Sequence, residues 1–135
     1  MTLFLDANVV IYLVEGAKAI RERVAMRLGE YRREGGWEVV AVSRLSWLEC
    51  RIRPLRLRDR SALSAYEQFF NAPDLIVVEL SATVVETAAQ LRAALNLSTP
   101  DALQAASALQ IEGPVRFFSN DLRLARVPGL TIEAI

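Results

Sequence analysis

The sequence predicts an α/β fold of three layers, in which a mostly parallel central sheet is flanked by helices on both faces. Short apolar segments alternate along the chain with longer segments of helical period, which is typical of a parallel sheet. The apolar segments are almost continuously hydrophobic, as strands buried on both faces are. The chain has 135 residues, of which 53% are hydrophobic. This is enough for one domain, residues 1–135, with a substantial core.

The first half of the chain alternates strand and helix signals. Gly35 and Gly36 should end the long second helix, because glycine readily adopts the backbone conformation found at helix ends. Ser43 is expected to cap the helix after the second strand, and Pro54 to interrupt it at about Arg53. The predicted elements are a strand over Leu3–Leu5, helices over Asn8–Val14 and Ala17–Glu34, a strand over Val39–Val42, and helices from Ser43 to Arg53 and over Asp59–Asn71.

The second half begins with a third strand and contains the clearest helix signal. That helix has Ser98 or Thr99 as its cap, Pro100 in its first turn, and Gly113 just beyond its end. Ser81 is the expected cap of the helix before it. The predicted elements are a strand over Leu75–Val78, helices over Ala82–Leu95 and Thr99–Ile111, a strand over Val115–Phe118, a helical turn over Asp121–Ala125, and a last strand over Leu130–Ile132.

The absence of histidine excludes several kinds of active site. The chain contains no histidine and a single cysteine, Cys50. Ser-His-Asp catalysis, Cys-His catalysis and histidine-rich zinc sites are therefore excluded. Cys50 lies in an apolar helical segment and is interpreted as a small core residue. A metal ion would have to be held by oxygen ligands, which favours magnesium or manganese.

Four acidic residues are candidates for a functional site at one edge of the sheet. Asp6 ends the first strand, and Glu49 lies in the helix after the second. Asp101 lies in the first turn of the helix after Pro100, and Asp121 follows the fourth strand. Sites in parallel sheets form at the carboxyl ends of the strands. The four acids are therefore expected to lie close together.

Each of these acids also has a structural explanation. Asp6 could cap a helix, and Glu49 could pair with Ser46 in a capping box. Asp101 could serve the helix dipole, and Asp121 could belong to an ordinary turn. Against this, crowded carboxylates repel one another unless a cation neutralises them. A divalent ion on such a cluster lowers the pKa of a coordinated water, so phosphodiester hydrolysis then needs no histidine.

Four segments, in order, resemble the PIN domain, and specifically the VapC-type toxins of bacterial and archaeal toxin–antitoxin pairs. The segments are LFLDANVVIYL, AVSRLSWLEC, STPDALQAASAL and FFSNDLRL. The resemblance spans the chain and implies that Asp6, Glu49, Asp101 and Asp121 are the metal-binding and catalytic acids. It also gives Asn8, Ser119 and Asn120 supporting roles. Many family members have another residue where Gln104 stands, and Gln104 receives no role.

What the resemblance implies is a Mg²⁺- or Mn²⁺-dependent endoribonuclease that cuts structured RNA such as transfer or ribosomal RNA. It further implies a homodimer silenced by a cognate antitoxin that reaches the acidic site. The longest apolar run near the N-terminus is too short to span a membrane, and no signal peptide is visible, so a cytoplasmic protein is expected. A non-catalytic PIN module, a nuclease acting on DNA and a receiver-type signalling domain are the alternatives. The receiver class needs a lysine at the end of a late strand, whereas Lys18 is the only lysine.

Two surface features could serve partners. The net charge is zero, yet five arginines lie within ten residues of one another. They could form a phosphate-binding edge beside Glu49, or they could be solvated, paired with acids or turned toward an antitoxin. These arginines are Arg51, Arg53, Arg56, Arg58 and Arg60. Trp37, Trp47 and Tyr66 are candidates for apolar surface that a partner buries, with core burial the stronger interpretation for Trp47.

Overall fold

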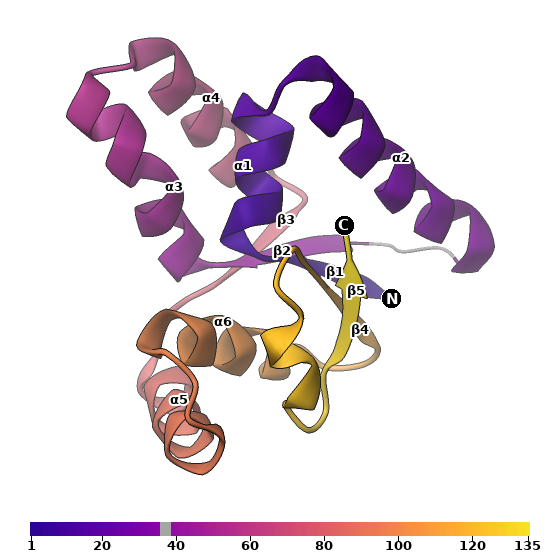
Figure 1. Cartoon of the computed structure of the whole chain (residues 1–135), viewed down its shortest axis with the longest axis vertical. Coiled ribbons are helices and arrows are strands. Elements are labelled where there is room, and N and C mark those ends of the chain that lie inside the picture. The colour runs from indigo at the N-terminus through magenta and orange to yellow at the C-terminus, as the bar shows by residue number, and fades with distance from the viewer. Residues whose placement is uncertain (36–38) are drawn as a thin grey trace.

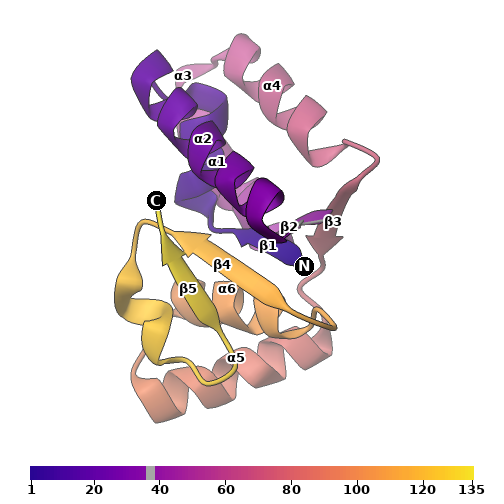
Figure 2. The same ribbon diagram turned by 90° about the vertical axis from the view of Figure 1, so that its right-hand side faces the viewer.

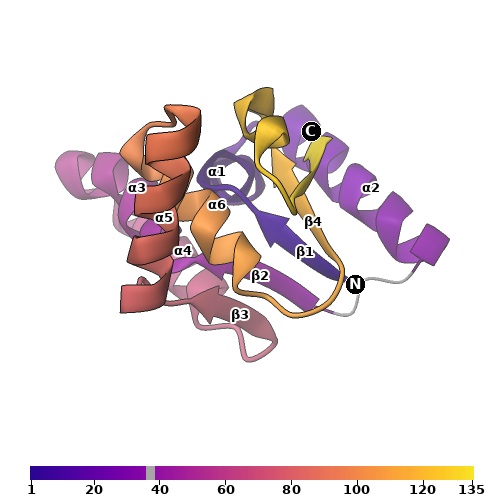
Figure 3. The ribbon, with the colours of Figure 1, turned by 90° about the horizontal axis from the view of Figure 1, so that it is seen from below.

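A computed structural model of the chain describes residues 1–35 and 39–135. Five strands form one sheet in the order β3-β2-β1-β4-β5, and all four neighbouring pairs are parallel. Figure 3 shows β1 in the middle of this sheet. The predicted parallel sheet is therefore confirmed. The strands are β1 (Thr2–Leu5), β2 (Val39–Ser43), β3 (Leu75–Val78), β4 (Val115–Ser119) and β5 (Thr131–Ala134).

Helices cover both faces of the sheet, which confirms the predicted three layers (Figures 1 and 2). One face carries α1 (Ala7–Glu15), α2 (Lys18–Gly35), α3 (Arg44–Leu57) and α4 (Arg60–Phe70). The other face carries α5 (Ala82–Leu95), α6 (Thr99–Leu109) and the short 3-10 helix η1 (Leu122–Arg126). No helix in the described ranges is long and apolar enough to cross a membrane.

Alternating residues of the inner strands build two separate hydrophobic cores. Leu3, Leu5 and Phe118 pack with α1 to α4 on one face. Phe4 and Phe117 pack with α5 and α6 on the other, where their rings stack with centroids 5.1 Å apart. Successive side chains of a strand point to opposite faces of the sheet. Because both faces of β1 and β4 are packed against helices, these two strands are held firmly and keep the polar residues at their ends in fixed positions.

Three predicted serine caps are confirmed by hydrogen bonds. The Oγ atoms of Ser43, Ser81 and Ser98 accept from backbone N–H groups in the first turns of α3, α5 and α6, at 3.1, 3.2 and 3.2 Å. The start of each of these helices could therefore be predicted from the local sequence. The end of α6 differs, because the helix stops at Leu109 rather than at Ile111.

The predicted end of the third helix at Arg53 is wrong. α3 continues through Pro54 to Leu57 and ends at Arg58, whose φ of 51° is left-handed. Proline removes one helical hydrogen bond, but its fixed φ is compatible with a helix. Here Pro54 is buried, and α3 packs against both α1 and α4. Tertiary packing therefore outweighs the local penalty.

The aromatic residues proposed for partner contacts divide into three cases. Tyr66 is fully buried in the core, so its proposed role at a surface is wrong. Trp47 is half-buried and packs edge-on against Phe70, with ring centroids 5.2 Å apart. Trp37 lies outside the described residues, as does the expected helix stop at Gly36.

Candidate active site

The candidate site lies at the carboxyl ends of β1 and β4, the neighbouring strands at the centre of the sheet. From β1 the chain order runs through β2 to β3 on one side and through β4 to β5 on the other. Such a reversal point is where parallel sheets form binding crevices. Asp6 follows β1 directly, and its backbone N–H donates to the Phe118 carbonyl of β4 at 3.0 Å. Glu49 and Asp101 come from α3 and α6, which contact each other.

Asp6 is a helix cap and a candidate site residue at the same time. Its side chain is buried, with 9% exposed. Oδ1 accepts from the backbone N–H of Ala7 at 2.8 Å, and Oδ2 accepts from the Ser119 hydroxyl at 2.6 Å. Burial raises the pKa of Asp6, and the charges of Asp101 and Asp121 raise it further, against the lowering effect of the two hydrogen bonds. The raised pKa means that these surroundings disfavour the ionised carboxylate, which a nearby cation would stabilise.

Glu49 is held by Gln104, a residue to which the sequence assigned no role. The Gln104 Nε2 group donates to Glu49 Oε1 at 3.0 Å and to Ser46 Oγ at 2.9 Å. Burial raises the pKa of Glu49, and the charges of Asp6 and Asp101 add to this, whereas the Gln104 hydrogen bond lowers it. The sequence signal that could have identified Gln104 is its place on the buried face of α6, where most of the other residues are alanine.

Asp121 faces a cation that the sequence did not reveal as part of the site. The Arg123 Nε group donates to Asp121 Oδ1 at 3.0 Å and to Oδ2 at 2.8 Å, and Nη2 also contacts Oδ2. This guanidinium lowers the pKa of Asp121. Arg123 Nη2 also lies 3.8 Å from Asp101 Oδ2. Arg123 therefore joins two of the four acids.

The three predicted supporting residues connect β4 to α1. The Ser119 Oγ atom accepts from the Asp121 N–H at 2.9 Å while its hydroxyl donates to Asp6. Asn8 Oδ1 accepts from the backbone N–H of Asn120 at 3.4 Å, and Asn120 Nδ2 donates to the Tyr12 hydroxyl at 2.8 Å. These bonds place the segment carrying Asp121 beside Asp6.

The carboxylate oxygens of the four acids are the kind of ligand that a hard divalent cation prefers. Asp6 interacts electrostatically with Glu49, Asp101 and Asp121, and all four supply carboxylate oxygens. Within residues 1–35 and 39–135, no three acidic or cysteine side chains converge closely enough to form a ready metal site. Mutual repulsion favours such separation when no cation neutralises the charges. The structure thus brings the acids to one edge without closing them around a common point.

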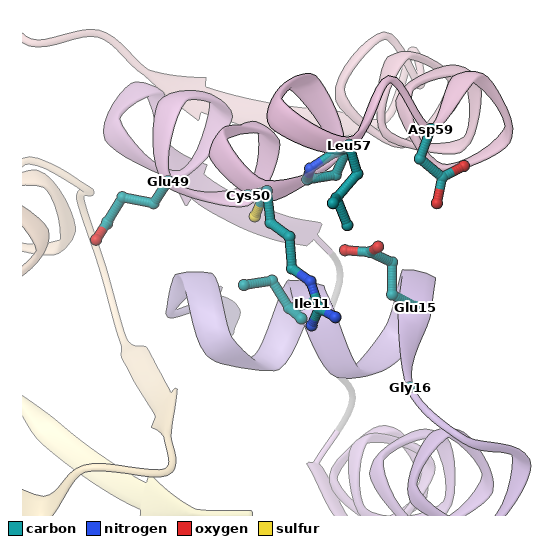
Figure 4. A pocket seen from close by; sticks show the side chains of 9 residues that line it. Ile11, Glu15, Gly16, Glu49, Cys50, Leu57 and Asp59 are labelled. Carbon is teal, nitrogen blue, oxygen red and sulfur yellow. The ribbon is translucent and has the colours of Figure 1, made fainter.

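A cleft of about 470 Å³ between α1 and α3 extends from the site. Figure 4 shows Glu49 at one end of the cleft and Asp59 toward the other, with Ile11 and Glu15 on α1. Cys50 lines its wall, and burial raises the pKa of this thiol to about 12. A protonated, buried thiol is a poor nucleophile, which agrees with its interpretation as a core residue.

The five arginines of the 51–60 segment differ in their surroundings. The Arg51 guanidinium lies over the Trp47 ring, 3.9 Å from its centroid, and its Nε is buried without a hydrogen-bond partner. Arg53 lines the cleft beside Glu49. Arg56, Arg58 and Arg60 are exposed to solvent. Arg53, Arg56, Arg58 and Arg60 are therefore accessible to a ligand. The Arg51 guanidinium instead packs on the Trp47 ring.

Replacing Glu49 with glutamine should stabilise the metal-free protein at neutral pH. The folded state raises the pKa of Glu49 above 4.5, so it retains a proton longer than the unfolded chain does. The wild type therefore loses stability as pH rises through the unfolded and then the folded value. Glu49→Gln cannot ionise and avoids this loss. We expect its Tm to exceed that of the wild type by a few degrees at about pH 7 and to match it near pH 3. An equal Tm difference at both pH values would contradict this expectation.

Comparisons with known proteins agree with this architecture. Residues 3–130 match the PIN domain family. Three solved complexes have similar chains: VapBC2 from Rickettsia felis bound to a promoter DNA fragment, a toxin–antitoxin complex from Klebsiella pneumoniae, and FitAcB from Neisseria gonorrhoeae. Their TM-scores are 0.77, 0.63 and 0.69 at 18%, 22% and 18% identity. The matches cover 99%, 97% and 96% of this chain and 98%, 96% and 95% of those chains. No curated protein matches the sequence.

Proposed function

Because this chain belongs to the PIN domain family, we propose that it is a metal-dependent endoribonuclease and the toxin of a toxin–antitoxin pair. The observation that carries the proposal is the buried Asp6 at the centre of the sheet, electrostatically coupled to Glu49, Asp101 and Asp121. Buried carboxylates whose pKa values are raised by burial and by neighbouring charges cluster at functional sites. Similarity to chains from three toxin–antitoxin complexes supports the toxin role.

Asp6, Glu49 and Asp101 are the proposed ligands of Mg²⁺ or Mn²⁺, and Asp121 completes the acidic site. When bound, such an ion would activate water for attack and neutralise charge on the scissile phosphate. Ser119 and the Ala7 N–H fix both oxygens of Asp6, so this carboxylate is oriented before an ion arrives. Gln104 does the same for one oxygen of Glu49.

The cleft between α1 and α3 is the proposed path of RNA toward these acids. It begins at Glu49, and Arg53 on its wall offers a guanidinium for a backbone phosphate. The proposed partners are a cognate antitoxin that silences the enzyme and a second copy of the chain, in the cytoplasm. The VapBC2, Klebsiella and FitAcB complexes supply the analogy for the antitoxin.

The direct test is cleavage of structured RNA by the purified chain. We expect cleavage with Mg²⁺ or Mn²⁺ and none after the chelator EDTA removes the ion. Restoring the ion should restore cleavage, and adding the cognate antitoxin should abolish it. Binding of RNA without cleavage under any metal condition would instead identify a non-catalytic module. Cleavage of DNA alone would contradict the substrate.

The exposed arginines after the cleft provide a second, independent measurement. Each phosphate contact releases counterions, so RNA affinity falls as salt rises, with a slope of about 0.7 per contact on single strands. Replacing Arg56, Arg58 and Arg60 together by alanine should therefore reduce that slope by about 2. Arg21, Arg23 and Arg33 on the exposed face of α2 form a matched control triple. An unchanged slope in the first variant would exclude this surface from RNA binding.

A further inference from the structure

One guanidinium occupies the acidic site in a way that the proposed chemistry does not use. Arg123 contacts both carboxylate oxygens of Asp121 through its side chain, and its backbone N–H donates to Oδ1 at 2.9 Å. The same side chain reaches Asp101 at 3.8 Å. It belongs to η1, the helix that Asp121 itself caps. The ion pair is therefore built into one short segment.

This arrangement occupies most of the acceptor positions of the Asp121 carboxylate, of which an ionised carboxylate has about four. Its carboxylate accepts three N–H groups from one residue, which are the backbone, Nε and Nη2 groups of Arg123. A divalent ion at Asp121 would compete with the guanidinium for these oxygens. It would also lie close to a positive charge, which is unfavourable for a second cation. Asp6 and Glu49, by contrast, accept hydrogen bonds only from neutral donors among the contacts in the described chain. Asp101 is intermediate, because Arg123 approaches it only to 3.8 Å, whereas the same guanidinium makes hydrogen bonds to Asp121.

We infer that Arg123 takes the place of a second cation, so that the site binds a single divalent ion through Asp6, Glu49 and Asp101. This inference rests on the proposed function, because it assigns the metal stoichiometry of that same site. Arg123 is a positioning residue in this scheme: it neutralises Asp121 and holds it beside Asp101 without contacting the reacting atoms. A fixed guanidinium has the charge of one cation but leaves no open position for water.

The test is a count of bound Mn²⁺ ions on the full chain, by calorimetric titration with MnCl₂ and by electron paramagnetic resonance of free Mn²⁺. We expect one ion per chain for the wild type and two for Arg123→Ala. Arg123→Lys keeps the positive charge and should bind one ion. Arg126→Ala removes another exposed arginine of η1 and should also bind one. Arg123 is 72% exposed, so its replacement should not prevent folding, which circular dichroism can verify.

A double variant locates the extra ion. Asp121→Asn combined with Arg123→Ala should return the count to one, because the second ion depends on the freed Asp121 carboxylate. Two ions on the wild type, or one ion on Arg123→Ala, would overturn the inference while leaving a metal-dependent nuclease intact. A second ion that persists in the double variant would overturn it as well. A wild type that binds no Mn²⁺ and cleaves no RNA would refute the proposed function, and the inference with it.

Discussion

Replacing Asp101 with asparagine should reduce RNA cleavage by more than about a hundredfold. Asp101 is one of three proposed metal ligands, and even residues that only support such ligands cost 10- to 100-fold when removed. Asparagine keeps the shape of the side chain but lacks the charge that attracts a divalent ion. The loss should appear in kcat/KM at saturating Mg²⁺, measured on a structured RNA.

The fold should survive this change. Asp101 sits in the first turn of α6, where a negative charge contributes about 0.3–1 kcal/mol through the helix dipole. A loss of that size lowers Tm by only a few degrees. Asp74→Asn is the matched control, because Asp74 is exposed and lies just before β3, at the amino end of the strands. Cleavage by Asp101→Asn at the wild-type rate would remove Asp101 from the site.

Gln104→Met should lower cleavage about 10- to 100-fold, the range expected when the support of a metal ligand is lost. Methionine matches glutamine in length and fills the same buried space, but it cannot donate to Glu49 or Ser46. The Gln104 side chain also buries an Oε1 atom that has no hydrogen-bond partner. Removing this unsatisfied oxygen offsets part of the lost bonding, so we expect stability to change less than activity.

The pH profile separates this role from simple packing. The bond from Gln104 favours the ionised form of Glu49 and lowers its pKa. Without it the pKa of Glu49 rises further, so the acidic limb of the kcat/KM profile should move to higher pH. Gln90→Met on the exposed side of α5 is the matched control and should leave the profile in place. A lower rate with an unmoved acidic limb would mean that Gln104 acts through packing alone.

Local sequence signals were sufficient for most of the fold. Strand positions followed from short apolar segments, and the helix starts at Ser43, Ser81 and Ser98 followed from capping chemistry. The proposed double role of Asp6 illustrates that a structural explanation and a functional one need not compete. The same carboxylate caps α1 through Oδ1, while its Oδ2 accepts a hydrogen bond from Ser119 at the end of β4.

Long-range pairs account for what the sequence did not reveal. Gln104 and Glu49 are 55 residues apart, and no periodic pattern shows that they share a hydrogen bond. Arg123 lies two residues from Asp121, yet proximity in sequence does not by itself indicate an ion pair. Pro54 was misjudged because the burial that keeps it helical comes from neighbouring helices.

The position of β1 has a consequence for how the molecule is made. Within this domain, the middle strand β1 is synthesised before every other strand, whereas its neighbour β4 comes after β2 and β3. The Asp6–Ser119 hydrogen bond closes a span of 113 residues. Contacts between residues so far apart in the sequence slow folding. A growing chain that has not yet reached Ser119 lacks the partner that orients Asp6, and so the acidic site cannot be assembled until β4 has been translated.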